Sequence, residues 1–366
     1  MPAKNIDMLV VLLETLDEIE SLLHENCMKN IGHNDSWKKF INQMLEKIGL
    51  HITSSKRFSE WQQYYSHDPQ GLISSLQTLK ELIAAPNQLE SVYSLLDDDK
   101  SRETFIWFIK YRIAYVCLSN RATAVYSPPV DFLLWEKYLA DIETSKLKLD
   151  VCKIGPYFIR CTDPSALLGS WSEEVYRLKG ICEPEKGDWI IDGGAFQGDT
   201  TLWFSNLVGP EGKVFAFEPF GENYDILVEN VKKNNIENVI PIPKALYNKS
   251  CAFSMMGDGQ GAMLVEGNSN VNVIETISID EYTQSQNCSQ VNFIKMDIEG
   301  AEAPALEGAV KTIKRYLPKL AISVYHKGTD IVAIPKLIKN IEPNYKLYLR
   351  HRSNSWVDTV LYAVIH

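Results

Sequence analysis

The chain has 366 residues, which exceeds the usual size of one domain and predicts two. Hydrophobic residues make up 45% of it and charged residues 23%, proportions typical of a folded globular protein and not of a disordered one. The formal net charge of −10 argues against a nucleic acid or an anionic membrane surface as the main partner.

Apolar residues recur at three- and four-residue spacing from residue 5 to about residue 150, as in Leu9, Leu12 and Leu16. This period predicts an all-helical N-terminal domain over residues 1–150. No run is long enough to cross a bilayer, and the first apolar run has no signal-peptide cleavage site. The seven cysteines are scattered without a Cys-x-x-Cys pair, which indicates reduced thiols, no zinc site and a cytoplasmic protein.

A second domain is predicted over residues 151–366. It opens with a short extended pair at 153–160 and a helix at 172–178. From Gly187 onward, apolar runs of strand length alternate with helical spacing, which is the signature of a parallel sheet with crossover helices. The predicted strands are 189–192, 213–218, 239–243, 291–296 and 319–325, and the predicted helices are about 199–207, 222–235, 302–316 and 329–340.

The end of the chain predicts an antiparallel hairpin of residues 346–349 and 359–364. A doubly wound, Rossmann-like parallel sheet that is closed by such a pair has the α/β architecture of class I methyltransferases. On spacing alone, other doubly wound folds compete with it.

A glycine turn follows the first strand of this domain. The apolar run before it ends in Asp192, Gly193 and Gly194, and Gly198 opens the next helical segment. The interval from Gly194 to Gly198 is one residue longer than in a dinucleotide fingerprint, and the preceding acid suits an ammonium or sulfonium group better than a diphosphate. A purely structural turn would show the same glycines.

The second strand ends in Glu218, which is placed to accept the two hydroxyls of a ribose. A nucleoside with an amino-acid tail and no phosphates is S-adenosylmethionine, so we expect Asp192, Gly193, Gly194, Gly198 and Glu218 to bind it. Ala245 follows the third strand and is placed for a backbone contact with the adenine.

Three acids follow the fourth strand, namely Asp297, Glu299 and Glu302. They are either helix-start acids stabilised by the helix dipole or groups beside the bound cofactor. Asp297 is expected to be both cofactor-binding and catalytic. His326 lies just past the next strand and is the candidate general base, although a lone histidine can also be structural.

Two further contacts are open at this rim. Asp297, Glu299 and His326 could hold a Mg²⁺ ion, but no dedicated ligand spacing requires one. Arg350, in the polar turn between the last two strands, is a candidate anion contact on the acceptor side; a solvated turn is the alternative.

Several motifs in this order resemble those of FkbM-type S-adenosylmethionine-dependent methyltransferases over about residues 170–366. They are Asp192-Gly193-Gly194-Ala195-x-x-Gly198, Phe217-Glu218-Pro219, Thr276-Ile277-Ser278-Ile279-Asp280, Lys295-Met296-Asp297-Ile298-Glu299-Gly300-Ala301-Glu302 and Asp358-Thr359-Val360-Leu361-Tyr362. The fourth is the most specific. Gly193 departs from the small β-branched residue that is more usual there.

The resemblance implies a methyl transfer to a hydroxyl of a sugar, a glycan or a secondary metabolite. The helical domain, which it does not cover, would cap the active site or bind a partner or carrier. The alternatives are a methyltransferase-fold scaffold without turnover and a nicotinamide-dependent oxidoreductase, the latter disfavoured by the glycine spacing.

Overall fold

The computed structural model describes residues 86–118, 126–130, 151–256, 263–265, 273–353 and 357–365. The chain divides into two compact units. The larger unit, residues 92–106 and 128–366, contains every strand named below. The predicted helical domain of residues 1–150 lies mostly outside the described residues. Its described helices are α5 (Pro86–Leu95) and α6 (Asp99–Leu118). Within the described residues, no helix combines the length and hydropathy that a membrane crossing requires.

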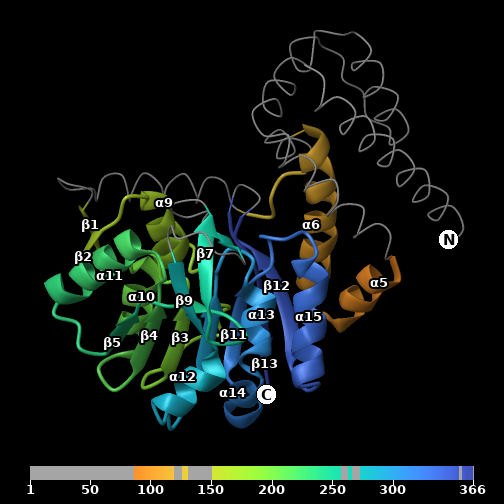
Figure 1. Cartoon of the computed structure of the whole chain (residues 1–366). Helices are drawn as coiled ribbons and strands as arrows, with labels where there is room; N and C mark the ends of the chain where they lie inside the picture. Colours follow the sequence, from red (N-terminus) through yellow and green to blue (C-terminus); the bar gives the residue numbers. More distant parts are fainter. Residues whose placement is uncertain are drawn as a thin grey trace, which may run out of the picture. The chain divides into compact units, whose positions relative to one another are not determined.

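A seven-stranded sheet forms the centre of the larger unit (Figure 1). Its strands lie in the order β12 (Lys346–His351), β13 (Thr359–Val364), β11 (Lys319–Ser323), β10 (Phe293–Met296), β3 (Trp189–Gly193), β4 (Lys213–Phe217) and β5 (Val239–Ile242). The five strands from β11 to β5 are parallel, whereas β13 is antiparallel to both of its neighbours. The predicted doubly wound sheet with a terminal antiparallel pair is therefore confirmed.

The order of the strands reverses direction between β3 and β10. From β3 the chain moves outward to β4 and β5, and from β10 it moves the opposite way to β11. Because crossovers between parallel strands are right-handed, the helices of the two halves lie on opposite faces of the sheet. They are α10 (Asp199–Val208) and α11 (Gly221–Lys233) in one half, and α13 (Glu302–Glu307), α14 (Val310–Tyr316) and α15 (Asp330–Ile341) in the other (Figure 1). Such a reversal leaves a crevice at the carboxyl ends of the two central strands.

Two smaller sheets flank the central one. The hairpin of β1 (Val151–Ile154) and β2 (Tyr157–Arg160) is the extended pair predicted for residues 153–160. It is fastened to α11, because the Asn230 amide donates to the Arg160 carbonyl and accepts from its N–H. The second small sheet has the order β6 (Ala245–Leu246), β9 (Val273–Ile277), β7 (Ala252–Met256) and β8 (Met263–Val265), and α12 (Ile279–Ser285) follows it.

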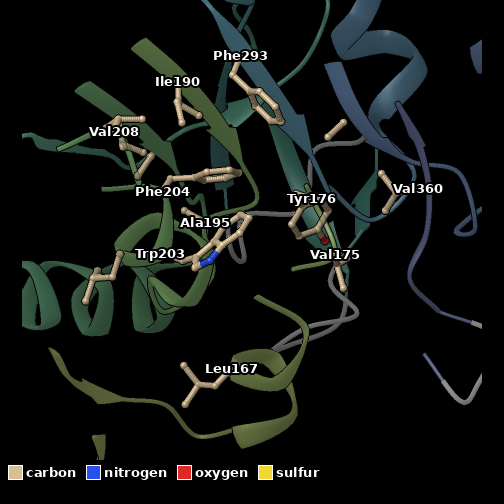
Figure 2. Packing of buried hydrophobic residues seen from close by; sticks show 14 of the residues in the cluster. Leu167, Val175, Tyr176, Ile190, Ala195, Trp203, Phe204, Val208, Phe293 and Val360 are labelled. Atoms are coloured by element: carbon tan, nitrogen blue, oxygen red, sulfur yellow. The ribbon is translucent and has the colours of Figure 1, made fainter. Parts of the chain in front are cut away.

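The core beneath the sheet consists of aromatic and branched side chains from β3, β10 and α10 (Figure 2). Phe204 of α10 packs against Phe293 of β10, with ring centroids 5.7 Å apart, and both are fully buried. Ile190 of β3 lies in the same cluster. Continuous apolar strands of this kind are expected where helices cover both faces of a parallel sheet.

The prediction of a helix over residues 172–178 is wrong. The helical residues lie just before it, in α9 (Pro164–Leu167) and the π-helical turn η3 (Leu168–Ser172). Pro164 suits the first position of a helix. The following segment turns at Glu174, which has a left-handed backbone, and Arg177 is held there by ion pairs with Glu174 and Glu183.

The helix predicted over residues 302–316 is divided at Gly308 into α13 and α14. A side chain at Gly308 would meet the Tyr247 carbonyl oxygen at 2.4 Å, so the chain passes close to its neighbour there. The Asp280 carboxylate accepts the Lys311 and Thr312 N–H groups and thereby begins a second helix. Asp280, part of a motif quoted above, therefore caps a helix.

Candidate active site

A cavity of about 460 Å³ lies at the carboxyl ends of the central strands, at the point where the strand order reverses. Its volume is in the range of small-molecule and cofactor sites. Most of the residues expected to bind the cofactor or to act in catalysis line it, namely Gly194, Glu218, Ala245, Asp297 and His326. Asp192, Gly193 and Gly198 are not part of its wall.

Gly194 is the point where the glycine turn touches both the cavity and the neighbouring strand. Its φ is +73°, and a Cβ there would lie 1.8 Å from the Asp297 carbonyl oxygen. The ends of β3 and β10 can approach this closely only with glycine at that position. A Cβ at Gly193 would meet Leu246, and one at Gly198 would meet Leu227. The three glycines therefore serve close contacts within the protein.

Lys295 fixes the glycine turn from behind. It stands on β10 and is 1% exposed, and its ammonium donates to the carbonyls of Gly193 and Gly194 at 3.0 and 2.7 Å. Burial alone would lower the pKa of this lysine, but the charges of Asp192, Asp297 and Asp199 raise it above its usual value. A charged lysine therefore holds the backbone that forms one wall of the cavity.

Asp192, which was expected to contact the cofactor, does not line the cavity, because its carboxylate faces inward. Asp192 is 0% exposed, accepts hydrogen bonds from the hydroxyls of Thr200 and Thr201, and lies 3.1 Å from the Lys295 ammonium. Its register opposite Lys295 on the adjacent strand accounts for this inward orientation. Asp192 thus pairs with Lys295, which lines the cavity, and does not line the cavity itself.

Asp199 lines the cavity in its place, at the first position of α10. Burial raises the pKa of Asp199 to about 6, and the Ser170 hydroxyl donates to its carboxylate at 2.6 Å. Sequence reasoning missed this residue. The sequence feature that could have indicated it is an acid directly after the glycine that opens a helix.

Glu218 follows β4 and lines the cavity as predicted. Its carboxylate accepts the N–H groups of Phe196 and Phe220, both at 2.9 Å, which fixes the side chain. Burial raises the pKa of Glu218 to about 7 against the lowering effect of these two amides. Ala245, on β6, also lies in the wall, where the adenine contact was expected.

Asp297 is the most heavily contacted acid of the cavity. The Tyr176 and Tyr325 hydroxyls donate to its two oxygens at 2.5 and 3.0 Å, and His326 Nε2 lies 3.2 Å away. Burial would raise the pKa of this carboxyl, but His326, Lys295 and Tyr176 together lower it well below its ordinary value. Asp297 is therefore ionised throughout the physiological range and is a weak proton acceptor.

His326 lies among three carboxylates. Its Nε2 is 3.2 Å from Asp297 and 3.5 Å from Glu299, and its Nδ1 is 2.9 Å from the fully buried Glu302. Burial would lower the pKa of the imidazole, but the charges of Glu302 and Asp297 raise it well above its usual value. An imidazolium has no lone pair to accept a proton, so the predicted role of His326 as general base does not fit this geometry.

A magnesium site is also not supported by this arrangement. Ligand atoms of Asp297, Glu302 and His326 lie within 4.8 Å of one another. However, both ring nitrogens face carboxylates at ion-pair distance, as in an imidazolium, whereas a metal-bound histidine is neutral. Mg²⁺ moreover prefers oxygen ligands.

Glu299 is an acid of the cavity wall that also reaches solvent. It lines the cavity, and its side chain is 38% exposed. Its φ is +54°, a left-handed conformation that is uncommon for a residue with a side chain. Burial, together with Asp297 and Glu302, raises the pKa of Glu299 to about 7, and His326 opposes this rise.

Two further residues of the site, besides Asp199, were not expected from the sequence. Nothing in the sequence marks Tyr176 as a residue of the site, because its segment was predicted as a helix. Lys295 had a signal that was not used: a lone lysine within the apolar run of a strand that helices cover on both faces must be buried and paired. The sequence expectation for Arg350 is wrong, since it pairs with Asp98 at 2.6 Å, is 7% exposed and does not line the cavity.

Comparison with known proteins agrees with this geometry. Residues 192–346 match the family model of the methyltransferase FkbM domain. Hexuronic acid methyltransferase AglP of Haloferax volcanii is 27% identical over 201 residues, which is 50% of this chain and 80% of that protein. The crystal structure of methyltransferase FkbM from Methylobacillus flagellatus KT superposes with a TM-score of 0.58 at 18% identity, over 95% of this chain and 76% of that one, and shows the same fold.

Proposed function

Because residues 192–346 match the model of the FkbM methyltransferase domain, we propose that this protein is an S-adenosylmethionine-dependent O-methyltransferase whose acceptor is a hydroxyl of a sugar or glycan. One observation carries the proposal. The carboxylates of Glu218, at the end of β4, and Asp297, at the end of β10, line a single cavity beside Gly194.

The cavity fits the proposed cofactor on the chemistry of its wall. Glu218 offers a fixed carboxylate to the ribose hydroxyls. Asp199 and Asp297 would offer negative charge to its ammonium and sulfonium groups, and Gly194 contributes its backbone to the cavity wall. When bound, S-adenosylmethionine supplies an electrophilic methyl group.

The protein's own contribution is to hold the acceptor oxygen in line with that methyl group and to take up its proton. The tyrosine hydroxyls of Tyr176 and Tyr325 and the ring of His326 hold Asp297 in one orientation. The cavity thereby keeps a fixed charge beside the reacting centre without reorganisation.

The acceptor end favours a hydroxyl over a carboxylate. Asp297, Glu299 and Asp358 all line the cavity, and three acids would repel an anionic group. The Haloferax relative is named for hexuronic acid, a sugar that carries both hydroxyls and a carboxylate. We propose a sugar hydroxyl as the acceptor and keep the exact sugar open to experiment.

The test is calorimetric titration with S-adenosylmethionine and S-adenosylhomocysteine, followed by methyl transfer to free sugars, nucleotide sugars, lipid-linked glycans and polyketides. We expect binding of both nucleosides, none of NADH, and turnover on a sugar hydroxyl. Glu218→Ala should weaken binding at least about 10-fold, as loss of a charge-assisted hydrogen bond does. Glu222→Ala, on the exposed face of the next helix, is the matched control.

Binding without turnover on any acceptor would instead support the scaffold alternative. NADH binding without nucleoside binding would support the oxidoreductase. The helical region before residue 150 is proposed to bind the acceptor's carrier or a partner. Deletion of residues 1–85, which keeps Asp98 and its pair with Arg350, should then raise the acceptor KM.

A further inference from the structure

The turn between β10 and α13 presents one acid to the cavity in a strained conformation. Glu299 and Gly300 have φ values of +54° and +88°, two successive left-handed residues. Glycine adopts this conformation freely, but a residue with a Cβ loses about 1–2 kcal/mol there. The chain therefore keeps a glutamate where glycine would be more stable.

The turn is held at both of its ends. The Glu302 carboxylate accepts the Ile298 N–H at 2.8 Å, and the Lys327 ammonium donates to the Gly300 carbonyl. A Cβ at Gly300 would lie 2.9 Å from Lys327, so the lysine packs directly on the turn. Glu299 is thus carried at the tip of a rigid turn, and strain that the surroundings maintain in this way is common at functional sites.

Three other ionisable groups near the acceptor end, Asp297, His326 and Lys295, are less suited than Glu299 to take up a proton. Asp358 is the remaining acid at that end, and burial raises its pKa to about 7 as well. Asp297 already accepts two tyrosine hydroxyls, and His326 carries its proton between carboxylates. Lys295 is occupied by two carbonyls and Asp192. Glu299 lies 3.5 Å from His326 and also interacts electrostatically with Asp297, Glu302, Lys295 and Tyr325.

On the basis of the proposed function, we infer that Glu299 is the general base that deprotonates the acceptor hydroxyl. In this step the O–H bond breaks and its proton moves to the Glu299 carboxylate. The acceptor oxygen uses the freed electron pair to form the O–CH₃ bond, and the S–CH₃ bond breaks with its electrons left on sulfur. The products are a methyl ether and S-adenosylhomocysteine.

Two properties of Glu299 agree with this role. Burial and the neighbouring acids raise its pKa to about 7, and a base with a pKa near the working pH is the most effective. Its side chain is 38% exposed, so the proton can pass to solvent after each turnover. The charge of His326 limits the rise in pKa that burial, Asp297 and Glu302 cause, so the Glu299 carboxyl titrates near neutral pH.

The experiment measures single-turnover methyl transfer by the full chain, preloaded with S-adenosylmethionine, to the sugar acceptor that the panel of acceptors described under the proposed function selects. Glu299→Gln keeps the size and backbone of the side chain. We expect its rate to fall by about 100-fold or more, the usual contribution of a general base, with the donor Kd unchanged. The wild-type rate should rise with pH through an apparent pKa near 7, and the variant should lose this rise.

Glu307→Gln, an exposed acid at the end of α13, is the matched control and should keep the wild-type rate and pH profile. A rate within about threefold of wild type for Glu299→Gln would overturn the assignment, since a base contributes far more. It would also be overturned if Asp358→Asn, at the same end of the cavity, abolished the pH-dependent rise while Glu299→Gln kept it. A wild-type chain that binds the donor but methylates no hydroxyl would refute both the proposed function and the base.

Discussion

Lys295 and Asp192 lie opposite each other on neighbouring parallel strands and form an ion pair of 3.1 Å from which solvent is excluded. Asp192 is 0% and Lys295 1% exposed. The pair joins β3 to β10 at the place where the strand order reverses, and through Lys295 it holds the carbonyls of the glycine turn.

Removal of one partner should therefore be costly. Lys295→Met leaves the Asp192 charge buried without its cation, and we expect the free energy of unfolding to fall by about 3–5 kcal/mol. Urea denaturation measures this loss. The double variant Lys295→Met with Asp192→Asn should lose less than the sum of the two single variants, since it leaves no lone charge.

The exposed ion pair of Lys319 with Glu185 provides the control. Lys319→Met should cost about 1 kcal/mol or less, because solvent screens this pair. Equal losses for Lys295→Met and Lys319→Met would contradict the role given to the buried pair.

The energetic cost of a side chain in the close contact at Gly194 can be measured apart from the cost of its left-handed backbone conformation. Gly194 and Gly180 have nearly the same φ, +73° and +75°, but a Cβ at Gly180 meets nothing within 4 Å. Gly180→Ala should therefore cost about 1–2 kcal/mol, the price of the left-handed conformation alone.

Gly194→Ala should cost about 2–5 kcal/mol, since it adds overpacking against the Asp297 carbonyl to that strain. Donor binding should fall with it, because the same turn forms the cavity wall. Urea unfolding and calorimetry of both variants test this. A Gly194→Ala variant that matches Gly180→Ala in stability would show that the two strand ends can separate freely.

The sequence predicted the parts of this site that depend on where a strand ends. Apolar runs located the central strands, and strand ends share one edge of a parallel sheet, so Glu218, Asp297 and His326 were expected together and do line one cavity. What a side chain does at that edge depends on neighbours that are distant in sequence. The inward orientation of Asp192 follows from its register with Lys295, about a hundred residues later.

The charge of His326 could not be predicted from the sequence either. It is set by Asp297, Glu299 and Glu302, which a tight turn brings around both ring nitrogens. The spacing of these acids indicated a helix start, and α13 does begin at Glu302. The left-handed turn at Glu299, which could not be read from the spacing, aims that side chain into the cavity.

Glu218 makes the stability of the ligand-free protein depend on pH. Burial raises its pKa from 4.5 to about 7, so between these values the folded chain binds more protons than the unfolded one. Stability therefore falls as pH rises through this interval, by about 3 kcal/mol for this one group. Asp199, whose pKa burial raises to about 6, acts in the same direction.

Urea unfolding at several pH values between about 5 and 8 should show this fall in the wild-type chain. Glu218→Gln cannot ionise, so its free energy of unfolding should depend less on pH over the same range. An unchanged slope would mean that the Glu218 carboxyl is not desolvated in the folded state. Saturating S-adenosylmethionine should raise the stability of the wild type more than that of the variant.

The sequence and the structure assign different roles to Arg350. The sequence placed it in a polar turn as an anion contact, but the Asp98 carboxylate, some 250 residues earlier, accepts two of its N–H groups. Its side chain also donates to Ser101. Asp98 keeps its charge in this geometry: burial would raise its pKa, but Arg350 and Ser101 lower it to about 2.

Arg350→Met should therefore act on stability and not on the acceptor. We expect a loss of about 2–4 kcal/mol, somewhat below a fully buried pair because Asp98 is 32% exposed, and an acceptor KM within about twofold of wild type. Arg160→Met, which removes a more exposed pair with Glu229, should cost about 1 kcal/mol or less. A raised KM for anionic acceptors together with unchanged stability would instead return Arg350 to the acceptor site.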